Sequence, residues 1–140
     1  MKETVKKAFQ QHVANEPFAK IFDLKLVEID EGYSKVQMKP TEDMKNIFGM
    51  IHGGAIFALI DEAFETASNS HGSLSVALNM NVTYLRSPAF SSVLTAEAKE
   101  IHRTRKTATY EIRVSDEEDN LIATCQALVY RKEKPLPFFS

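Results

Sequence analysis

The chain has 140 residues, of which 44% are hydrophobic and 26% charged, and this is the size and composition of one globular domain. Its formal net charge of -2 gives no broad basic field, which argues against nucleic acid as a partner and leaves room only for a local basic cluster. The sequence has one cysteine, no signal-peptide pattern at its start and no apolar run near the roughly 20 residues that cross a bilayer. We therefore expect a single cytoplasmic domain over residues 1–140, without a membrane anchor.

Apolar residues at helical spacing predict a short amphipathic N-terminal helix that lies against a larger body. Two strands follow, with Gly32 in the hairpin turn between them. After a loop, a continuous apolar segment predicts one long helix that is buried on all sides. These elements span residues 2–15 (helix), 24–31 and 33–39 (strands), 43–52 (loop) and 53–69 (helix).

Alternation of apolar and polar residues returns after Gly72 and predicts four further strands, at residues 76–84, 93–102, 107–114 and 120–132. Short connections without a second crossover helix favour an antiparallel sheet. The sequence therefore predicts an α+β fold, in which a curved antiparallel sheet of five to six strands wraps around one central helix. Its core should occupy about residues 20–132. Residues 133–140 are expected to be a loose tail whose Phe138 and Phe139 pack on a neighbour.

Gly53 and Gly54 stand at the start of the long helix, where backbone N–H groups point outward without a Cβ atom to cover them. The positive end of the helix dipole lies behind these donors, so the pair is suited to bind an oxyanion. A turn that merely needs a flexible backbone would use the same two glycines. The pair is therefore a candidate oxyanion hole that needs support from elsewhere in the sequence.

Asp61 supplies that support, because it follows a six-residue apolar run on a helix that is predicted to be buried. An ionised carboxylate in such a place is costly unless it is paired or has a chemical role. The alternative is that Asp61 and Glu62 mark the point where the helix meets solvent. Glu65 shares a helix face with Asp61, whereas Glu62 points about 100° away. We expect Asp61 to be a catalytic base and Glu62 to be solvated or salt-bridged.

The sequence resembles the PaaI-type branch of the hotdog-fold thioesterases in the spacing of several motifs. These motifs are Asn46, His52-Gly53-Gly54 and Asp61, followed by Ser68-Asn69-Ser70 and the alternating strand Asn79–Tyr84. The resemblance runs from about residue 24 to residue 130. It implies a hotdog fold and hydrolysis of acyl-CoA thioesters, with coenzyme A as part of the substrate, no separate cofactor and no metal.

The resemblance also implies a role for each matching residue. The Gly53 N–H would polarise the thioester carbonyl, Asn46 would help to position it, and Asp61 would activate water or attack directly. His52 mostly braces the loop in such families. Some relatives place a serine beside the attacking water at the position of Ala77. Asn79, Thr83 and Thr66 are the candidates to replace that hydroxyl.

Gly53 and Asp61 lie eight residues apart, which is about 12 Å along an α-helix and too far for one subunit to place both on one carbonyl. Two such helices that run antiparallel about a two-fold axis would bring Gly53 of one chain to Asp61 of the other. We therefore expect a homodimer with shared active sites. The family resemblance implies the same arrangement, commonly doubled into a tetramer.

The nucleotide of coenzyme A needs phosphate-binding residues, and Arg and Lys at exposed edges suit this role. Such residues also occur in ordinary solvated turns. The acyl group is left open between an aryl-acetyl and an aliphatic chain, since Phe48, Met50, Ile51 and Phe57 could line a tunnel for either. The predicted substrate-binding residues are His52, Gly54, Glu65, Tyr84, Arg86, His102, Arg103, Arg105 and Lys106.

Two other functions compete with hydrolysis. A hotdog-type enoyl-CoA hydratase or dehydratase needs a histidine paired with an acid on the acyl chain, and the only loop histidine here stands directly before the two glycines. A non-catalytic acyl-CoA-binding protein is the other alternative, but the chain has no helix-turn-helix for reading DNA. Walker, dinucleotide-binding, zinc-protease and paired-cysteine motifs are all missing from the sequence, and Cys125 in its apolar strand is expected to be a core residue.

Overall fold

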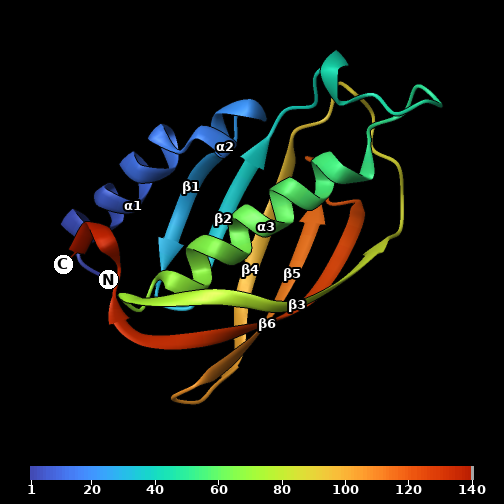
Figure 1. The fold of residues 1–140 in the computed structure, drawn as a ribbon. Coiled ribbons are helices and arrows are strands. Elements are labelled where there is room, and N and C mark those ends of the chain that lie inside the picture. The colour runs from blue at the N-terminus through green and yellow to red at the C-terminus, as the bar shows by residue number, and fades with distance from the viewer. Residues whose placement is uncertain (140) are drawn as a thin grey trace.

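A six-stranded antiparallel sheet curves around one long helix (Figure 1). This computed structural model describes residues 1–139. The helices are α1 (Glu3–Asn15), α2 (Pro17–Ile21) and α3 (Gly53–Asn69), with short 3₁₀ turns η1 (Glu42–Met44) and η2 (Pro137–Phe139). The strands are β1 (Lys25–Asp30), β2 (Tyr33–Met38), β3 (Ser73–Tyr84), β4 (Leu94–Arg103), β5 (Thr107–Ser115) and β6 (Leu121–Pro135).

The strands lie in the order β1-β2-β4-β5-β6-β3, and every neighbouring pair is antiparallel. The segment through α3 therefore leads from β2, beside one edge of the sheet, to β3 at the opposite edge. This arrangement confirms the predicted hotdog fold. Sequence pattern missed only the short helix α2, which begins at Pro17 with the proline in the first helical turn, where its missing N–H has no cost.

The core forms where α3 meets the sheet. Alternate residues of β2 and β5 point toward the helix and are buried, as the period of two predicts. Leu59, Ile60 and Phe64 of α3 are buried against them, and the ring of Phe64 packs edge-on to that of Tyr110 on β5. The expectation that α3 is buried on every side is wrong for one face, because the side chain of Phe57 is 36% exposed.

Two hydroxyl groups fix α3 on the sheet. Ser34 on β2 donates a hydrogen bond of 2.7 Å from its Oγ to the carbonyl of Ala63, in the middle of the helix. At the helix end, the Oγ of Ser70 accepts a 2.7 Å hydrogen bond from the N–H of Gly32. Gly32 has a φ of +69°, and a Cβ atom there would lie 2.8 Å from the carboxylate of Glu100, so the β1–β2 turn requires glycine. The position of α3 is thus determined at its middle and its end.

The C-terminal segment is ordered against the chain's own N-terminus, so the expectation of a loose tail is wrong. Strand β6 continues to Pro135, and the side chain of Leu136 is buried in the core. The ring of Phe138 stacks on that of His12 at 4.0 Å and packs edge-on to Phe9 of α1 at 5.4 Å. The core therefore extends beyond residues 20–132 at both ends, because α1 and this segment complete each other's apolar packing.

Strand β3 is an edge strand whose apolar side chains are largely uncovered in the single chain. Val76 is 38% exposed and Leu78 is 57% exposed, although the alternation of residues predicts that both face a core. The outer edge of β3 has no partner strand among residues 1–139. Long exposed edges with apolar residues are unusual in monomeric proteins, so this edge is suited to pairing with a second molecule.

No helix within the described part of the chain is long and apolar enough to cross a membrane.

Candidate active site

The turn that begins α3 leaves one backbone donor unused. His52 caps the helix, and its Nδ1 accepts a hydrogen bond of 2.8 Å from the N–H of Gly54. A neutral imidazole that accepts at Nδ1 carries its proton on Nε2. The N–H of Gly53 has no acceptor within residues 1–139. Of the two glycines, Gly53 is therefore the one with a donor free for an oxyanion.

Tyr84 holds the carbonyl side of this turn. Its hydroxyl donates a hydrogen bond of 3.2 Å to the carbonyl oxygen of Gly53, and its ring lies 3.4 Å from the position that a Cβ atom of Gly53 would occupy. Because β3 ends at Tyr84, the end of the edge strand directly positions the start of α3. Tyr84 was predicted as a substrate contact, and the geometry adds this role in orienting Gly53.

Asn46 shapes the loop that precedes the turn. Its Oδ1 accepts hydrogen bonds from the N–H groups of Phe48 and Met50, at 2.9 and 3.0 Å, and so closes a compact loop around Gly49. Within the described chain the Nδ2 of Asn46 has no acceptor. Asn46 therefore retains one side-chain donor beside Gly53, and hollows of about 540 and 330 Å³ flank that glycine.

Asp61 is half-buried on α3 and makes no hydrogen bond or ion pair with any residue from 1 to 139. Burial raises the pKa of its carboxyl group, and the negative charge of Glu16 raises it further. Cys125 of β6 is a core residue as predicted, and burial is the main cause that raises the pKa of its thiol to about 11, with the charge of Asp61 raising it further. A carboxylate with a raised pKa and no committed partner is suited to accept a proton from water.

Glu62 contradicts the expectation of a solvated or salt-bridged side chain, because it is only 2% exposed and forms no ion pair in the described chain. It belongs to a group of three carboxyl groups with Glu16 and Glu65, whose ligand atoms lie within 4.8 Å of one another. Burial raises the pKa values of Glu62 and Glu65, and the nearby carboxyl group of Glu16 raises them further. Carboxyl groups with pKa values raised in this way keep their protons at a higher pH than ordinary glutamates do.

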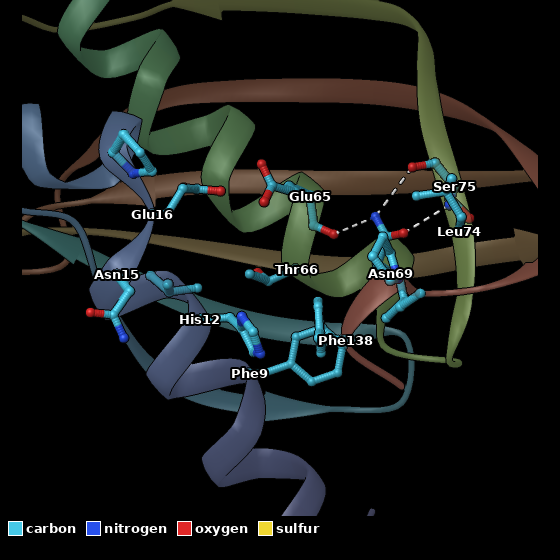
Figure 2. A pocket seen from close by; sticks show the side chains of 14 residues that line it. Phe9, His12, Asn15, Glu16, Glu65, Thr66, Asn69, Leu74, Ser75 and Phe138 are labelled. Carbon is cyan, nitrogen blue, oxygen red and sulfur yellow. Dashed lines mark hydrogen bonds between the residues drawn. The ribbon is translucent and has the colours of Figure 1, made fainter. Parts of the chain in front are cut away.

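Glu16 was not singled out from the sequence, because it comes from the turn between α1 and α2, far from α3 along the chain. Figure 2 shows its carboxylate directed toward that of Glu65. Oxygen atoms of Glu16 and Glu62 are buried without a partner within residues 1–139. Within residues 1–139, these three residues are the group whose ligand atoms lie close enough together to hold a cation.

Glu62→Gln is expected to flatten the pH dependence of stability. A carboxyl group with a raised folded-state pKa stabilises the protein fully below its unfolded value of about 4.5, and this contribution is lost as pH rises through the raised pKa. Between about pH 5 and pH 8 the wild-type Tm should therefore fall more steeply than that of the variant. Circular dichroism at several pH values measures this, with Glu118→Gln at an exposed position as the control. Equal slopes for all three proteins would contradict the assignment.

The predicted nucleotide-binding residues fall into two separate groups. Arg86 lies with Tyr84 around the smaller hollow beside Gly53. The group of residues 102–106 occupies the β4–β5 turn, at the opposite end of α3 (Figure 1). There Arg103 donates to Nδ1 of His71 at 2.6 Å and Arg105 pairs with Glu133 at 3.1 Å. A single chain therefore does not bring the two groups together.

Two of the three candidates for orienting the attacking water, Thr66 and Asn79, already make side-chain hydrogen bonds. The Oγ1 of Thr66 donates to helix carbonyl groups of α3, at 2.9 Å from Glu62 and 3.1 Å from Ala63. Asn79 accepts a hydrogen bond of 2.9 Å from Asn81 on the exposed face of β3. Separately, the larger hollow beside Gly53 is lined by the cation Lys45, which no sequence motif had indicated.

Comparison with known proteins places these observations in a family. Residues 48–123 match the model of the thioesterase superfamily. The acyl-coenzyme A thioesterase PaaI of Escherichia coli is 32% identical over 117 residues, which cover 84% of each chain. A proposed esterase of Archaeoglobus fulgidus is 39% identical over 123 residues, or 88% of this chain and 80% of that one.

The structural comparison agrees with the sequence comparison. The structure of the Escherichia coli PaaI protein, from the phenylacetic acid degradation operon, aligns with a TM-score of 0.88 and 28% identity. The alignment covers 94% of this chain and 95% of that one.

Proposed function

This chain belongs to the thioesterase superfamily, and from that premise we propose that it hydrolyses acyl-CoA thioesters to free coenzyme A and a carboxylic acid. Coenzyme A enters as part of the substrate, and no separate cofactor takes part. The observation that carries this proposal is the pair of unused groups on α3, the Gly53 N–H donor and the Asp61 carboxylate. Hydrolysis of a thioester needs one such donor and one such base.

In the proposed reaction, Asp61 takes a proton from a water molecule as its oxygen attacks the carbonyl carbon. The carbonyl oxygen becomes negatively charged and is stabilised by the N–H of Gly53, with the dipole of α3 behind it. Asn46 positions the substrate through its free Nδ2. When the tetrahedral intermediate collapses, the carbon–sulfur bond breaks and the proton held by Asp61 passes to the departing thiolate.

The two groups act together only if two chains share a site. They are about 12 Å apart along α3, so Gly53 of one subunit must meet Asp61 of another. The exposed edge of β3 and the uncovered Phe57 on α3 support an antiparallel pairing of two subunits through these elements. We propose this homodimer as the functional unit, and two such dimers would form the tetramer that the family resemblance implies.

The surroundings of His52 favour hydrolysis over hydration. A hydratase needs a histidine paired with an acid, but His52 accepts from Gly54 at Nδ1 and has no carboxylate partner in the described structure. A panel of acyl-CoA substrates, followed by release of free thiol, tests the proposal. Thiol release supports hydrolysis, whereas hydration of an enoyl-CoA without free coenzyme A, or binding without turnover, would contradict it.

Arg86→Ala is expected to raise KM for acyl-CoA several-fold while changing kcat little, and Lys106→Ala should do the same. A phosphate contact remote from the carbonyl binds substrate and transition state alike, so its loss appears in KM. Steady-state kinetics with acyl-CoA and with a short thioester that lacks the nucleotide separate binding from chemistry. If the short thioester suffers equally, these residues act on the fold or the chemistry and do not contact coenzyme A.

A further inference from the structure

A cavity of about 560 Å³ lies between α1, the last turns of α3, the start of β3 and the C-terminal segment (Figure 2). This volume is in the usual range for small-molecule sites. Its apolar walls come from elements far apart in sequence. These walls are formed by Phe9 and Val13 of α1, Leu74 of β3, and Leu136 and Phe138 of the C-terminal segment.

The cavity begins one helical turn beyond Asp61. Glu65 lines it, and Glu65 follows Asp61 by four residues, or about 6 Å along α3 on the same face. Thr66 and Asn69 continue the lining toward the end of the helix. A thioester with its carbonyl carbon at Asp61 therefore has this cavity within reach of its acyl group.

Two polar side-chain atoms at the cavity have no hydrogen-bond partner within residues 1–139. The Oγ of Ser75 is unbonded although the residue is only 7% exposed, and the Oε1 of Glu16 is buried and unbonded. An unpaired buried polar atom is unfavourable until a ligand satisfies it. The lining contains the carboxyl groups of Glu16 and Glu65 and no lysine or arginine, so it offers no such cation to pair with an anionic ligand.

We propose that this cavity receives the acyl group of the substrate, and that Phe138 forms the wall that limits its length. The guest is an uncharged, mainly apolar acyl group, and a neutral hydrogen-bond donor on it gains partners in Ser75 and Glu16. Acyl groups that end in a carboxylate are rejected. This inference rests on the proposed thioesterase function, which it deepens by naming the substrate class and the residues that select it.

The test measures kcat/KM for straight-chain acyl-CoAs of increasing length, together with ω-hydroxy and ω-carboxy acyl-CoAs of the preferred length. The same set is prepared as non-hydrolysable thioethers, whose Kd is measured by calorimetry. The variants are Phe138→Ala, the milder Phe138→Leu, Glu16→Gln, and Phe18→Ala as a matched control. Phe18 is half-exposed on α2 and does not line the cavity.

Phe138→Ala should raise kcat/KM about tenfold for the first chain that the wild type excludes, since one methylene in an apolar pocket changes specificity by at least this factor. Phe138→Leu should shift the limit less in the same direction, and Phe18→Ala should not shift it. Glu16→Gln should reduce the rejection of the ω-carboxy substrate. An unchanged length order in both Phe138 variants, or ω-carboxy substrates that the wild type accepts as well as uncharged ones, would overturn the proposal.

The thioethers separate this inference from the function on which it rests. If they bind in the expected length order and no acyl-CoA is hydrolysed, the proposed function is wrong and the acyl site stands. If acyl-CoA is hydrolysed but neither Phe138 variant changes the length order, the acyl site is wrong and the function stands.

Discussion

Replacing Asp61 with asparagine is expected to lower kcat by about 10² to 10⁴ while the protein folds and assembles normally, which is the usual range for loss of a general base. The amide keeps the size of the carboxylate but cannot accept a proton from water. Asp61 makes no hydrogen bond within the described chain, so the substitution removes no structural contact. Steady-state kinetics with a good acyl-CoA substrate, after circular dichroism and gel filtration, give the measurement.

Glu62→Gln is the matched control for this experiment, because it changes the neighbouring acid on the same helix. Its kcat at neutral pH should stay within about threefold of wild type, although its stability profile changes. Comparable losses of kcat in the two variants would mean that Asp61 is not the base.

The pH dependence of kcat gives a second test of Asp61 as the general base. Asp61 must be ionised to act, so activity is present above its pKa and is lost as pH falls through it. Because burial and Glu16 raise this pKa, the loss should begin at a higher pH than for an ordinary aspartate with a pKa of 3.8.

The sequence predicted those parts of the site that depend on local chain geometry. Gly53, Gly54 and Asp61 lie on one helix, and their spacing could be converted directly into distances along it. Asn46 and His52 belong to the adjoining loop. In the structure they hold that loop and its helix cap through hydrogen bonds over four residues or fewer.

The other features of the fold and the candidate site depend on contacts between segments far apart in the sequence, and a local sequence pattern does not encode such contacts. Glu62 was expected to be solvated or salt-bridged, yet it is buried and lies close to Glu16 from the α1–α2 turn. The two prolines near the C-terminus suggested a loose end, but Phe138 finds its partners on α1, more than a hundred residues earlier. On β3 the sequence predicts more burial than the single chain shows. Its alternating apolar side chains are exposed here, and a second subunit would cover them.

Mixing two inactive variants is expected to restore activity, because each supplies the group that the other lacks. Gly53→Pro removes the oxyanion donor and keeps Asp61, whereas Asp61→Asn keeps the donor and removes the base. Proline is tolerated in the first helical turn. His52 has ψ of 135°, which suits a residue before proline, and the nearest atom to a Cβ at position 53 is at an ordinary contact distance of 3.4 Å.

Each homodimer alone should be nearly inactive. In a heterodimer, one site combines the intact Gly53 of one chain with the intact Asp61 of the other, and the second site lacks both. Joint unfolding and refolding should therefore restore about half of the wild-type activity per heterodimer, or about a quarter overall for random pairing. Differently tagged chains and native mass spectrometry verify that subunits have exchanged.

The central claim is that Gly53 and Asp61 of different subunits act on one carbonyl, and this mixing experiment tests it most directly. If the site is shared, about a quarter of wild-type activity returns, and only after subunit exchange. If both variants fold and exchange subunits and the mixture stays as inactive as its components, Gly53 and Asp61 do not meet across an interface and the shared site is wrong.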